Sequence, residues 1–387
     1  MNIKRTYQEI NNKIKKGEAI VATAEEIISM VEEKGIKKVT QEIDVVTTGT
    51  FGPMCSSGAI LNFGHSDPPI KMQKIWLNDV EAYAGLAAVD AYLGATQLSE
   101  SQGMDYGGAH VIEDFILGKK IKLKALSYGT DCYPRKEIEV YITKESINQA
   151  ILFNPRNSYQ NYNVAINTSE KKMYTYMGIL LPEMGNANYS TSGQLSPLLK
   201  DPKFITIGIG TRIFLGGTQG YIAWEGTQFC PQESKDNKKG QQIYKGGTLA
   251  VIGNLKEMST DYIRAAIFKN YGISLMVGIG IPIPILNDEV MKYVSVKDEE
   301  IFTEVIDYSV PHLSRPSLGW VNYKQLREGK INIQGKEIPT SSLSSYAKAR
   351  EIAQKLKDEI IKGKFFLQEP IQKLPQKGEF KPLKGID

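Results

Sequence analysis

Apolar residues recur at helical spacing in several parts of the chain. Near the N-terminus, Ile10 and Ile14 lie one turn apart behind a capping box formed by Thr6 and Glu9. Near the C-terminus, the apolar positions of residues 342–362 share one face, which predicts a long amphipathic helix. Shorter stretches with the same spacing predict helices at residues 24–33, 79–93, 262–269 and 299–306.

Polar residues and glycines mark the ends of two of these helices. Thr23 and Glu26 form a second capping box before the helix at 24–33, and Gly35 ends it. Asn78 is the expected cap of the helix at 79–93, and Gly94 follows its last residue. Both stretches therefore have a helical start and stop signal.

Between these helices, β-branched and aromatic residues predict strands. They lie at residues 43–48, 121–126, 138–142, 162–167, 173–180, 204–209 and 273–279, with a hairpin around Gly335 at 331–338. Strands and helices do not alternate strictly, so a doubly wound parallel sheet is not expected. We predict a mixed α/β (α+β) fold with large mixed sheets, flanking helices and Gly-rich loops.

The chain is long enough for one large domain or two intimate subdomains. We expect residues 1–370 to form the folded region. Prolines follow at Pro370, Pro375 and Pro382, so we expect residues 371–387 to form an extended tail. A net charge of +4 without a long basic run gives no reason to expect nucleic acid. The longest apolar stretch, at 273–286, is too short to span a bilayer, and the N-terminus lacks the apolar core of a signal peptide. We expect a cytoplasmic protein without a membrane partner.

The three cysteines, Cys55, Cys132 and Cys230, are too few and too widely spaced for a zinc site or an iron–sulfur cluster within one chain. In a reducing compartment they should be free thiols. Cys230 precedes a proline and is expected to be structural. The local sequence around the other two is more informative.

Cys55 lies in a loop rich in Gly, Ser and Pro that follows the strand at 43–48. Glycines with positive φ would turn backbone amides toward the sulfur and stabilise its thiolate. His65 follows in the same loop, residues 49–67, and could transfer a proton. The structural alternative is a tight turn around a small buried thiol.

Cys132 lies in a polar loop between two predicted strands, beside Asp131, Arg135 and Lys136. Neighbouring cations favour the thiolate form of a cysteine, so this local sequence indicates a reactive thiol.

A third Gly-rich segment, residues 205–220, begins like a dinucleotide-binding motif but has Ile213 where the third glycine should fall. No phosphate-binding loop of the G-x-x-x-x-G-K-[ST] type is present. Arg212 in this segment could bind a small carboxylate, and a plain strand-to-strand turn is the alternative.

Residues 47–58, 127–135 and 208–220 resemble the homocysteine biosynthesis family, whose members are L-aspartate semialdehyde sulfurtransferases of methanogenic archaea and various anaerobic bacteria. The resemblance covers roughly residues 1–370, which would then be the catalytic region. Many archaeal relatives continue into a pair of CBS domains, for which this chain has no room. The resemblance implies a cysteine persulfide, with Cys132 as its carrier and Cys55 as its partner. It also implies a small ferredoxin-like iron–sulfur protein as partner.

Making a thiol from an aldehyde and sulfide consumes two electrons, and no flavin, nicotinamide or iron–sulfur motif is recognisable. We therefore expect no tightly bound cofactor and an external electron donor. In the expected cycle, Cys55 and Cys132 end as a disulfide that the partner reduces, so they should come within bonding reach. Arg135 and Arg212 are candidates for the substrate carboxylate, and His65 for the proton donor.

Other functions remain open from the sequence. The chain could be a non-catalytic persulfide carrier or docking subunit, which would yield no homocysteine on its own. It could be an acyl- or CoA-transferase with a glutamate nucleophile, whose activity would survive Cys132→Ser. A purely structural role for all three cysteines predicts slow alkylation of each. Whether the chain forms a homo-oligomer is also open.

Overall fold

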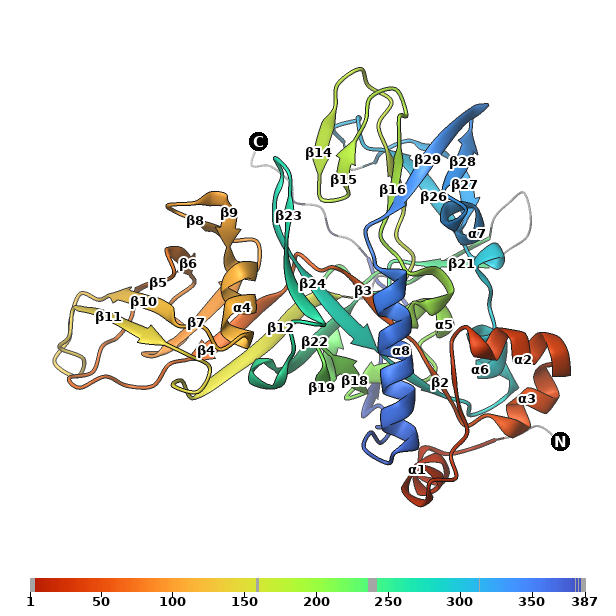
Figure 1. The fold of residues 1–387 in the computed structure, drawn as a ribbon, viewed down its shortest axis with the longest axis horizontal. Helices are drawn as coiled ribbons and strands as arrows, with labels where there is room; N and C mark the ends of the chain where they lie inside the picture. Colours follow the sequence, from red (N-terminus) through yellow and green to blue (C-terminus); the bar gives the residue numbers. More distant parts are fainter. Residues whose placement is uncertain are drawn as a thin grey trace.

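The computed structural model describes residues 4–157, 160–235, 242–312, 314–379, 381 and 383. Within these residues the fold is a mixed α/β arrangement of large sheets with helices packed on them, as the sequence predicts (Figure 1). A central sheet connects an arm, at the left of Figure 1, to a second sheet at the top and to a helical region at the lower right. None of the helices in this described part is long and apolar enough to cross a lipid bilayer.

The central sheet carries most of the core, and its strands come from distant parts of the chain. In the order β23-β24-β18-β19-β22-β12-β4-β7 neighbouring strands are hydrogen-bonded, and β3 pairs with β24. The strands are β3 (Thr50–Pro53), β4 (Gly58–Asn62), β7 (Asp90–Gly94), β12 (Gln149–Asn157), β18 (Arg212–Leu215), β19 (Thr218–Glu225), β22 (Leu249–Asn254), β23 (Ile263–Phe268) and β24 (Gly272–Gly280).

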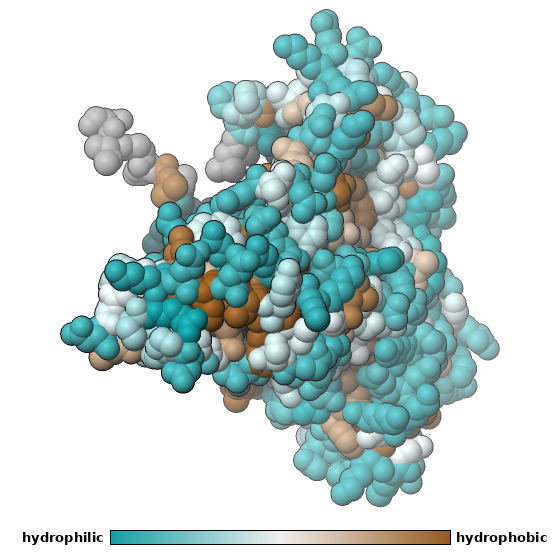
Figure 2. Space-filling model, turned by 60° about the vertical axis from the view of Figure 1, so that its left-hand side comes forward, coloured by the Kyte–Doolittle hydropathy of each residue, from teal (hydrophilic) through white to brown (hydrophobic). Residues whose placement is uncertain are grey.

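The arm is a six-stranded sheet in the order β11-β10-β5-β6-β8-β9. It comprises β5 (Lys74–Leu77), β6 (Val80–Ala82), β8 (Leu98–Ser99), β9 (Gly103–Gly107), β10 (Ile121–Leu126) and β11 (Glu137–Ile142), and α4 (Gly108–Ile116) packs between it and the central sheet. Figure 2 turns the arm toward the viewer and shows hydrophobic side chains gathered in a band across an otherwise hydrophilic surface.

The second six-stranded sheet has the order β27-β26-β13-β16-β29-β28 and its own apolar cluster. Its strands are β13 (Val164–Ile166), β16 (Ala187–Tyr189), β26 (Phe302–Asp307), β27 (Ser317–Asn322), β28 (Lys330–Ile333) and β29 (Lys336–Ser342). The hairpin β14 (Met173–Thr175)–β15 (Gly178–Leu180) extends from it.

Smaller elements complete the fold. The strands are β1 (Val21–Thr23), β2 (Val45–Thr47) and β25 (Pro282–Pro284) in one sheet, the pair β17 (Gly208–Ile209) and β30 (Gln372–Lys373), and the pair β20 (Gln232–Lys235) and β21 (Gln242–Lys245). The helices are α1 (Tyr7–Lys16), α2 (Glu26–Lys34), α3 (Ile36–Glu42), α5 (Pro197–Lys200), α6 (Asp288–Val294), α7 (Tyr323–Arg327) and α8 (Tyr346–Ile361), with short 3-10 turns η1 (Gly193–Leu195), η2 (Leu255–Glu257) and η3 (Asp298–Glu300).

Several predictions of local structure are confirmed. Thr6 and Glu9 form the capping box of α1, and the helix near the C-terminus forms as α8 with Ser345 as its cap. The bonds expected between Thr23 and Glu26 are present, although α2 begins only at Glu26. The hairpin around Gly335 is also present, as β28 and β29.

The predicted helix at 79–93 is wrong. Asn78 and Asp79 have φ of 50° and 61°, and they form a two-residue turn that pairs Leu77 with Val80. Positive φ at both central residues is the geometry that connects antiparallel strands tightly, and Asn and Asp tolerate it. Asn78 is therefore a hairpin residue rather than a helix cap, and residues 79–93 contain β6 and most of β7.

Two further helix predictions are wrong for a related reason. Residues 262–269 form β23, which continues through a turn with Asn270 at a φ of 55° into β24. Residues 299–306 contain only the turn η3 before β26, which pairs in parallel with β13. In both segments pairing with a neighbouring strand overrides weak helical periodicity.

The segment 49–67 was expected to be a loop, but it contains β3 and β4. Of its four glycines, Gly64 has a positive φ of 87°, whereas Gly49, Gly52 and Gly58, which lie nearer to Cys55, do not, contrary to the prediction. They are needed for close packing instead. A Cβ on Gly49 would lie 2.1 Å from the backbone oxygen of Ala349 in α8.

The predicted extended tail pairs with the body, since β30 joins β17 at Gly208. Residues 380, 382 and 384–387 of this tail lie outside the described residues.

Candidate active site

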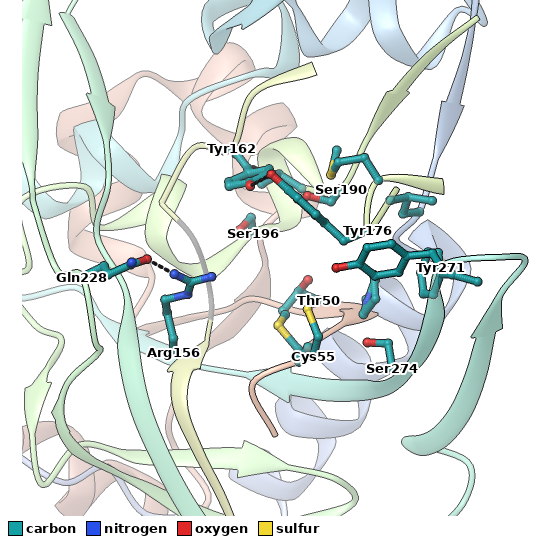
Figure 3. Close-up of a pocket in the computed structure, with 17 residues that line it drawn as sticks. Thr50, Cys55, Arg156, Tyr162, Tyr176, Ser190, Ser196, Gln228, Tyr271 and Ser274 are labelled. Atoms are coloured by element: carbon teal, nitrogen blue, oxygen red, sulfur yellow. Dashed lines mark hydrogen bonds between the residues drawn. The ribbon is translucent and has the colours of Figure 1, made fainter. Parts of the chain in front are cut away.

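A cavity of about 380 Å³ lies between the central sheet and the second six-stranded sheet (Figure 3). Its size is within the range of small-molecule sites in proteins. Cys55 lines it, just after β3, and its side chain is half-buried. The structure thus places one of the two predicted reactive cysteines where a small ligand could reach it.

The position of Cys55 follows from strand pairing. Pro53 pairs with Met276 of β24, and the Met54 N–H donates to the oxygen of Leu275 at 2.8 Å. The chain then passes alongside Ser274 as it leaves the sheet, and the Ser57 N–H closes a turn on the oxygen of Met54 at 3.0 Å. This turn holds Cys55 at the cavity wall between β3 and β4.

Hydroxyl groups line much of the cavity. The segment between β16 and α5 contributes three of them, and Thr50 and Ser274 belong to β3 and β24; the set is Thr50, Ser190, Thr191, Ser196 and Ser274. The Thr50 Oγ1 lies 3.3 Å from the Oγ of Ser192, which connects β3 to the second sheet. Such groups can orient a polar ligand by hydrogen bonds.

Arg156, near the end of β12, supplies the positive charge. It is the one Lys or Arg among the described residues that line the cavity, and no Asp or Glu is among them. Its guanidinium donates to the Oε1 of Gln228, an interaction drawn in Figure 3. A guanidinium in a cavity without a carboxylate can bind a carboxylate of the ligand.

Aromatic rings cover the opposite wall. Tyr162 donates its hydroxyl hydrogen to Tyr176 at 2.9 Å, and the Tyr176 oxygen lies 3.0 Å from that of Tyr308. Tyr271, in the turn between β23 and β24, has its ring centroid 6.2 Å from that of Tyr176. These rings give the cavity flat apolar faces with hydroxyl groups at their edges.

Cys132 is in a different place. It lies in the connection between β10 and β11, its side chain is exposed, and it is not among the described residues that line the cavity. In Figure 1 this connection lies at the far left end of the arm, whereas β3 lies near the centre of the molecule. The structure therefore does not bring Cys55 and Cys132 together within one chain, and both are free thiols.

Two other predicted site residues accompany Cys132. The Arg135 side chain donates to the backbone oxygens of Asp67 and Pro68. The His65 ring stacks on Tyr133 with centroids 6.2 Å apart, and His65 is exposed. Both lie outside the lining of the cavity as the described residues define it.

Arg212 and Cys230 have structural surroundings. Arg212 begins β18, its Nη1 donates to the oxygen of Phe366 at 3.3 Å, and its segment forms the β18–β19 hairpin. Cys230 is buried and its Sγ donates to the oxygen of Gly378 at 3.1 Å. The expected structural role of Cys230 is confirmed. Because Cys132 is exposed, the alternative that all three cysteines are core residues is wrong.

The cavity contains functional candidates that the sequence did not reveal. The pairing of β3 with β24 brings Tyr271 and Ser274 near Cys55, and β12 brings Arg156. Tyr162, just before β13, and Tyr176, in the turn between β14 and β15, come from the other side of the cavity. The one available signal was a high number of tyrosines, 20 in the chain, several of them clustered between residues 158 and 176.

Comparison with known proteins gives a consistent result. A profile described as homocysteine biosynthesis enzyme, sulfur-incorporation, matches residues 19–367. A protein of Methanosarcina acetivorans named L-aspartate semialdehyde sulfurtransferase is 54% identical over 99% of this chain and 74% of its own length. A protein of Methanocaldococcus jannaschii with the same name is 54% identical over 99% of this chain and 75% of its own length. The comparison with solved structures gives no match.

Proposed function

Because the chain belongs to the family of sulfur-incorporating homocysteine biosynthesis enzymes, we propose that it transfers sulfur to L-aspartate semialdehyde and forms L-homocysteine. Two relatives at 54% identity carry the name of this activity. The observation that carries the proposal is the placement of Cys55, a nucleophile, in a cavity that also holds a cation for a carboxylate.

Arg156 is the residue that binds the substrate carboxylate in this proposal. Gln228 holds its guanidinium in place, which reduces the entropy lost when the ligand binds. The substrate ammonium group lies against the tyrosine faces, where a cation is attracted to the π electrons. With the carboxylate at Arg156, the aldehyde extends toward the wall that Cys55 forms.

Cys55 carries the sulfur as a persulfide. The sequence favoured Cys132 for this role, but a carrier must reach the aldehyde, and Cys55 is the cysteine that lines the cavity. The terminal sulfur attacks the carbonyl carbon, and the oxygen finally leaves as water. Conversion of the persulfide and the aldehyde into the cysteine thiol, homocysteine and water requires four electrons and four protons. Two electrons cleave the sulfur–sulfur bond and two replace the carbon–oxygen bond by a carbon–hydrogen bond.

An external donor supplies these electrons, and a small ferredoxin-like iron–sulfur protein is the class of partner that fits. Cys132 is exposed at the end of the arm, beside Arg135 and Lys136. An exposed thiol with cations nearby in the sequence is accessible to a docked partner. We assign Cys132 to the surface at which this donor docks and Cys55 to the chemistry in the cavity.

The test is an anaerobic assay in which the purified chain is first loaded with persulfide by sulfide and a mild two-electron oxidant, and then receives L-aspartate semialdehyde and a low-potential reductant. Homocysteine should form, and Cys55→Ser should abolish its formation. Persulfide without homocysteine would instead indicate a carrier subunit. Full activity in Cys55→Ser would indicate a different nucleophile and would contradict the proposal.

A further inference from the structure

The hairpin of β23 and β24 presents two hydroxyl groups to the cavity beside Cys55. Tyr271 lies in the turn, where its N–H donates to the oxygen of Phe268 at 2.9 Å. Ser274 lies on β24, next to the residue that pairs with Met54 just before the cysteine. One rigid hairpin therefore fixes both hydroxyls relative to the sulfur.

The Ser274 hydroxyl has no hydrogen-bond partner among the described residues, although Ser274 is only 3% exposed. Figure 3 shows its oxygen directed toward Cys55. Leaving a buried hydroxyl without a partner costs about 1–3 kcal/mol. The Ser274 hydroxyl lies at the wall of the cavity and points toward Cys55. Because it has no partner among the described residues, we infer that an atom of the ligand completes its hydrogen bonding.

Tyr271 lies at the cavity mouth. Its side chain is 44% exposed, yet Figure 3 shows its hydroxyl directed inward, above Thr50 and Cys55. Burial of the ring raises the pKa of Tyr271, and the charges of Cys55 and Tyr176 raise it further. The phenol therefore keeps its proton inside the cavity, and its exposed edge lets water restore that proton after it is lost.

We propose that Tyr271 donates the proton to the aldehyde oxygen during carbon–sulfur bond formation, while Ser274 hydrogen-bonds the sulfur held on Cys55. This inference rests on the proposed function and concerns the addition step. The terminal sulfur anion of the persulfide forms a bond to the carbonyl carbon, and the carbon–oxygen π bond breaks. The oxygen takes the Tyr271 proton and becomes a hydroxyl. No electrons enter or leave in this step, and the phenolate regains a proton from water.

The groups that face the Tyr271 hydroxyl support this assignment. They are the Cys55 sulfur, the Tyr162–Tyr176 pair and, across the cavity, the Arg156 guanidinium. None of the described lining residues is a histidine, aspartate or glutamate. His65, the donor that the sequence suggested, is exposed and stacked on Tyr133. A tyrosine is therefore the acid that the cavity offers.

The first experiment follows sulfur in a single turnover of the full chain. Wild type, Tyr271→Phe and Ser274→Ala are loaded with persulfide, L-aspartate semialdehyde and a low-potential reductant are added, and discharge of the sulfur as homocysteine is timed. Tyr271→Phe should load normally and discharge about 10²–10⁴-fold more slowly, with little change in the aldehyde concentration that gives half of the maximal discharge rate. Ser274→Ala should discharge about tenfold more slowly, as expected for one lost hydrogen bond to a charged group. Tyr174→Phe, outside the cavity lining, is the matched control and should behave as wild type.

The second experiment separates proton donation from a structural role. Replacing Tyr271 with 3-fluorotyrosine, a more acidic phenol, should move the alkaline limb of the kcat profile to lower pH and leave melting unchanged. Discharge in Tyr271→Phe within threefold of wild type, or an unmoved alkaline limb, would overturn the inference. If wild type forms no homocysteine at all, the proposed function fails instead, so the two failures are distinguishable.

Discussion

The His65 ring stacks on the Tyr133 ring, with centroids 6.2 Å apart and planes inclined by 25°. This contact joins the segment after β4 to the connection between β10 and β11. Arg135 strengthens it through bonds to the Asp67 and Pro68 backbone. The residues that the sequence predicted to form one site therefore lie in two places. Cys55 lines the cavity, while His65 and Arg135 accompany Cys132 in a cluster at the surface.

This division predicts different effects for the two cysteines. Cys55→Ser should lower homocysteine formation by at least about 10³-fold under all conditions, because the nucleophile is lost. Cys132→Ser should retain activity within about tenfold when a small-molecule reductant replaces the protein donor. With a ferredoxin-like donor, the activity of Cys132→Ser should fall further. Equal losses with both reductants would contradict a role for Cys132 at the surface where the donor docks.

Arg156 is predicted to control affinity for the substrate. Arg156→Met removes a charge-assisted hydrogen bond worth about 1.5–3 kcal/mol, so kcat/KM for L-aspartate semialdehyde should fall about 10–100-fold. Steady-state kinetics measure this. Arg212→Met is the comparison, since Arg212 contacts Phe366 outside the cavity lining, and its KM should stay near the wild-type value. A larger effect at Arg212 would place the carboxylate elsewhere.

Gly49 is predicted to be essential for the contact between the strand before Cys55 and α8. Its added Cβ would lie 2.1 Å from the Ala349 oxygen, so Gly49→Ala should reduce the free energy of unfolding by about 1–3 kcal/mol or more. Gly94→Ala is a matched control in β7, because an added Cβ there meets nothing within 4 Å. Denaturant unfolding of both variants measures the difference, and similar stabilities would argue against this packing.

The buried Lys200 should make the stability of the folded protein depend on pH. The side chain is fully buried, and its Nζ donates to the oxygens of Val294 and Val296. Burial lowers the pKa of Lys200 to about 7, while Asp298, Glu300 and Glu25 oppose the shift. The folded state then binds fewer protons than the unfolded state between about pH 7 and the ordinary lysine pKa near 10.4.

The free energy of unfolding should therefore rise with pH across this window, by at most about 1.4 kcal/mol per pH unit from this group. The free energy of unfolding, measured from pH 7 to 9, should rise less steeply with pH in Lys200→Met than in wild type. Parallel slopes would mean that Lys200 stays charged in the folded protein.

The fold class and several elements could be predicted from the sequence because their signals are local. The capping box of Thr6 and Glu9 and the turn at Gly335 depend on neighbouring residues alone. Asn78 shows the limit of this approach, because an asparagine suits both a helix cap and a turn with positive φ. Its conformation is decided by the pairing of β5 with β6, which local spacing does not encode.

The candidate site shows the same limit more strongly. Cys55 and Cys132 could be singled out because each lies in an unusual loop, but nothing local says whether two loops meet. Arg156 and Ser274 could not be found, because each resembles any other strand residue until the register of β24 with β3 is known. The sequence therefore predicted two candidate cysteines, while their surroundings became known only from the structure.

The most direct test of the central claim is to locate the sulfur. The chain is loaded with sulfide under mild oxidant and the persulfide is mapped by alkylation, digestion and mass spectrometry, before and after reaction with L-aspartate semialdehyde and a low-potential reductant. The added sulfur atom should be found on the Cys55 peptide and should leave it when the aldehyde is present. Sulfur that resides on Cys132 and is discharged by the aldehyde from there, with Cys55 unmodified, would contradict a reaction in this cavity.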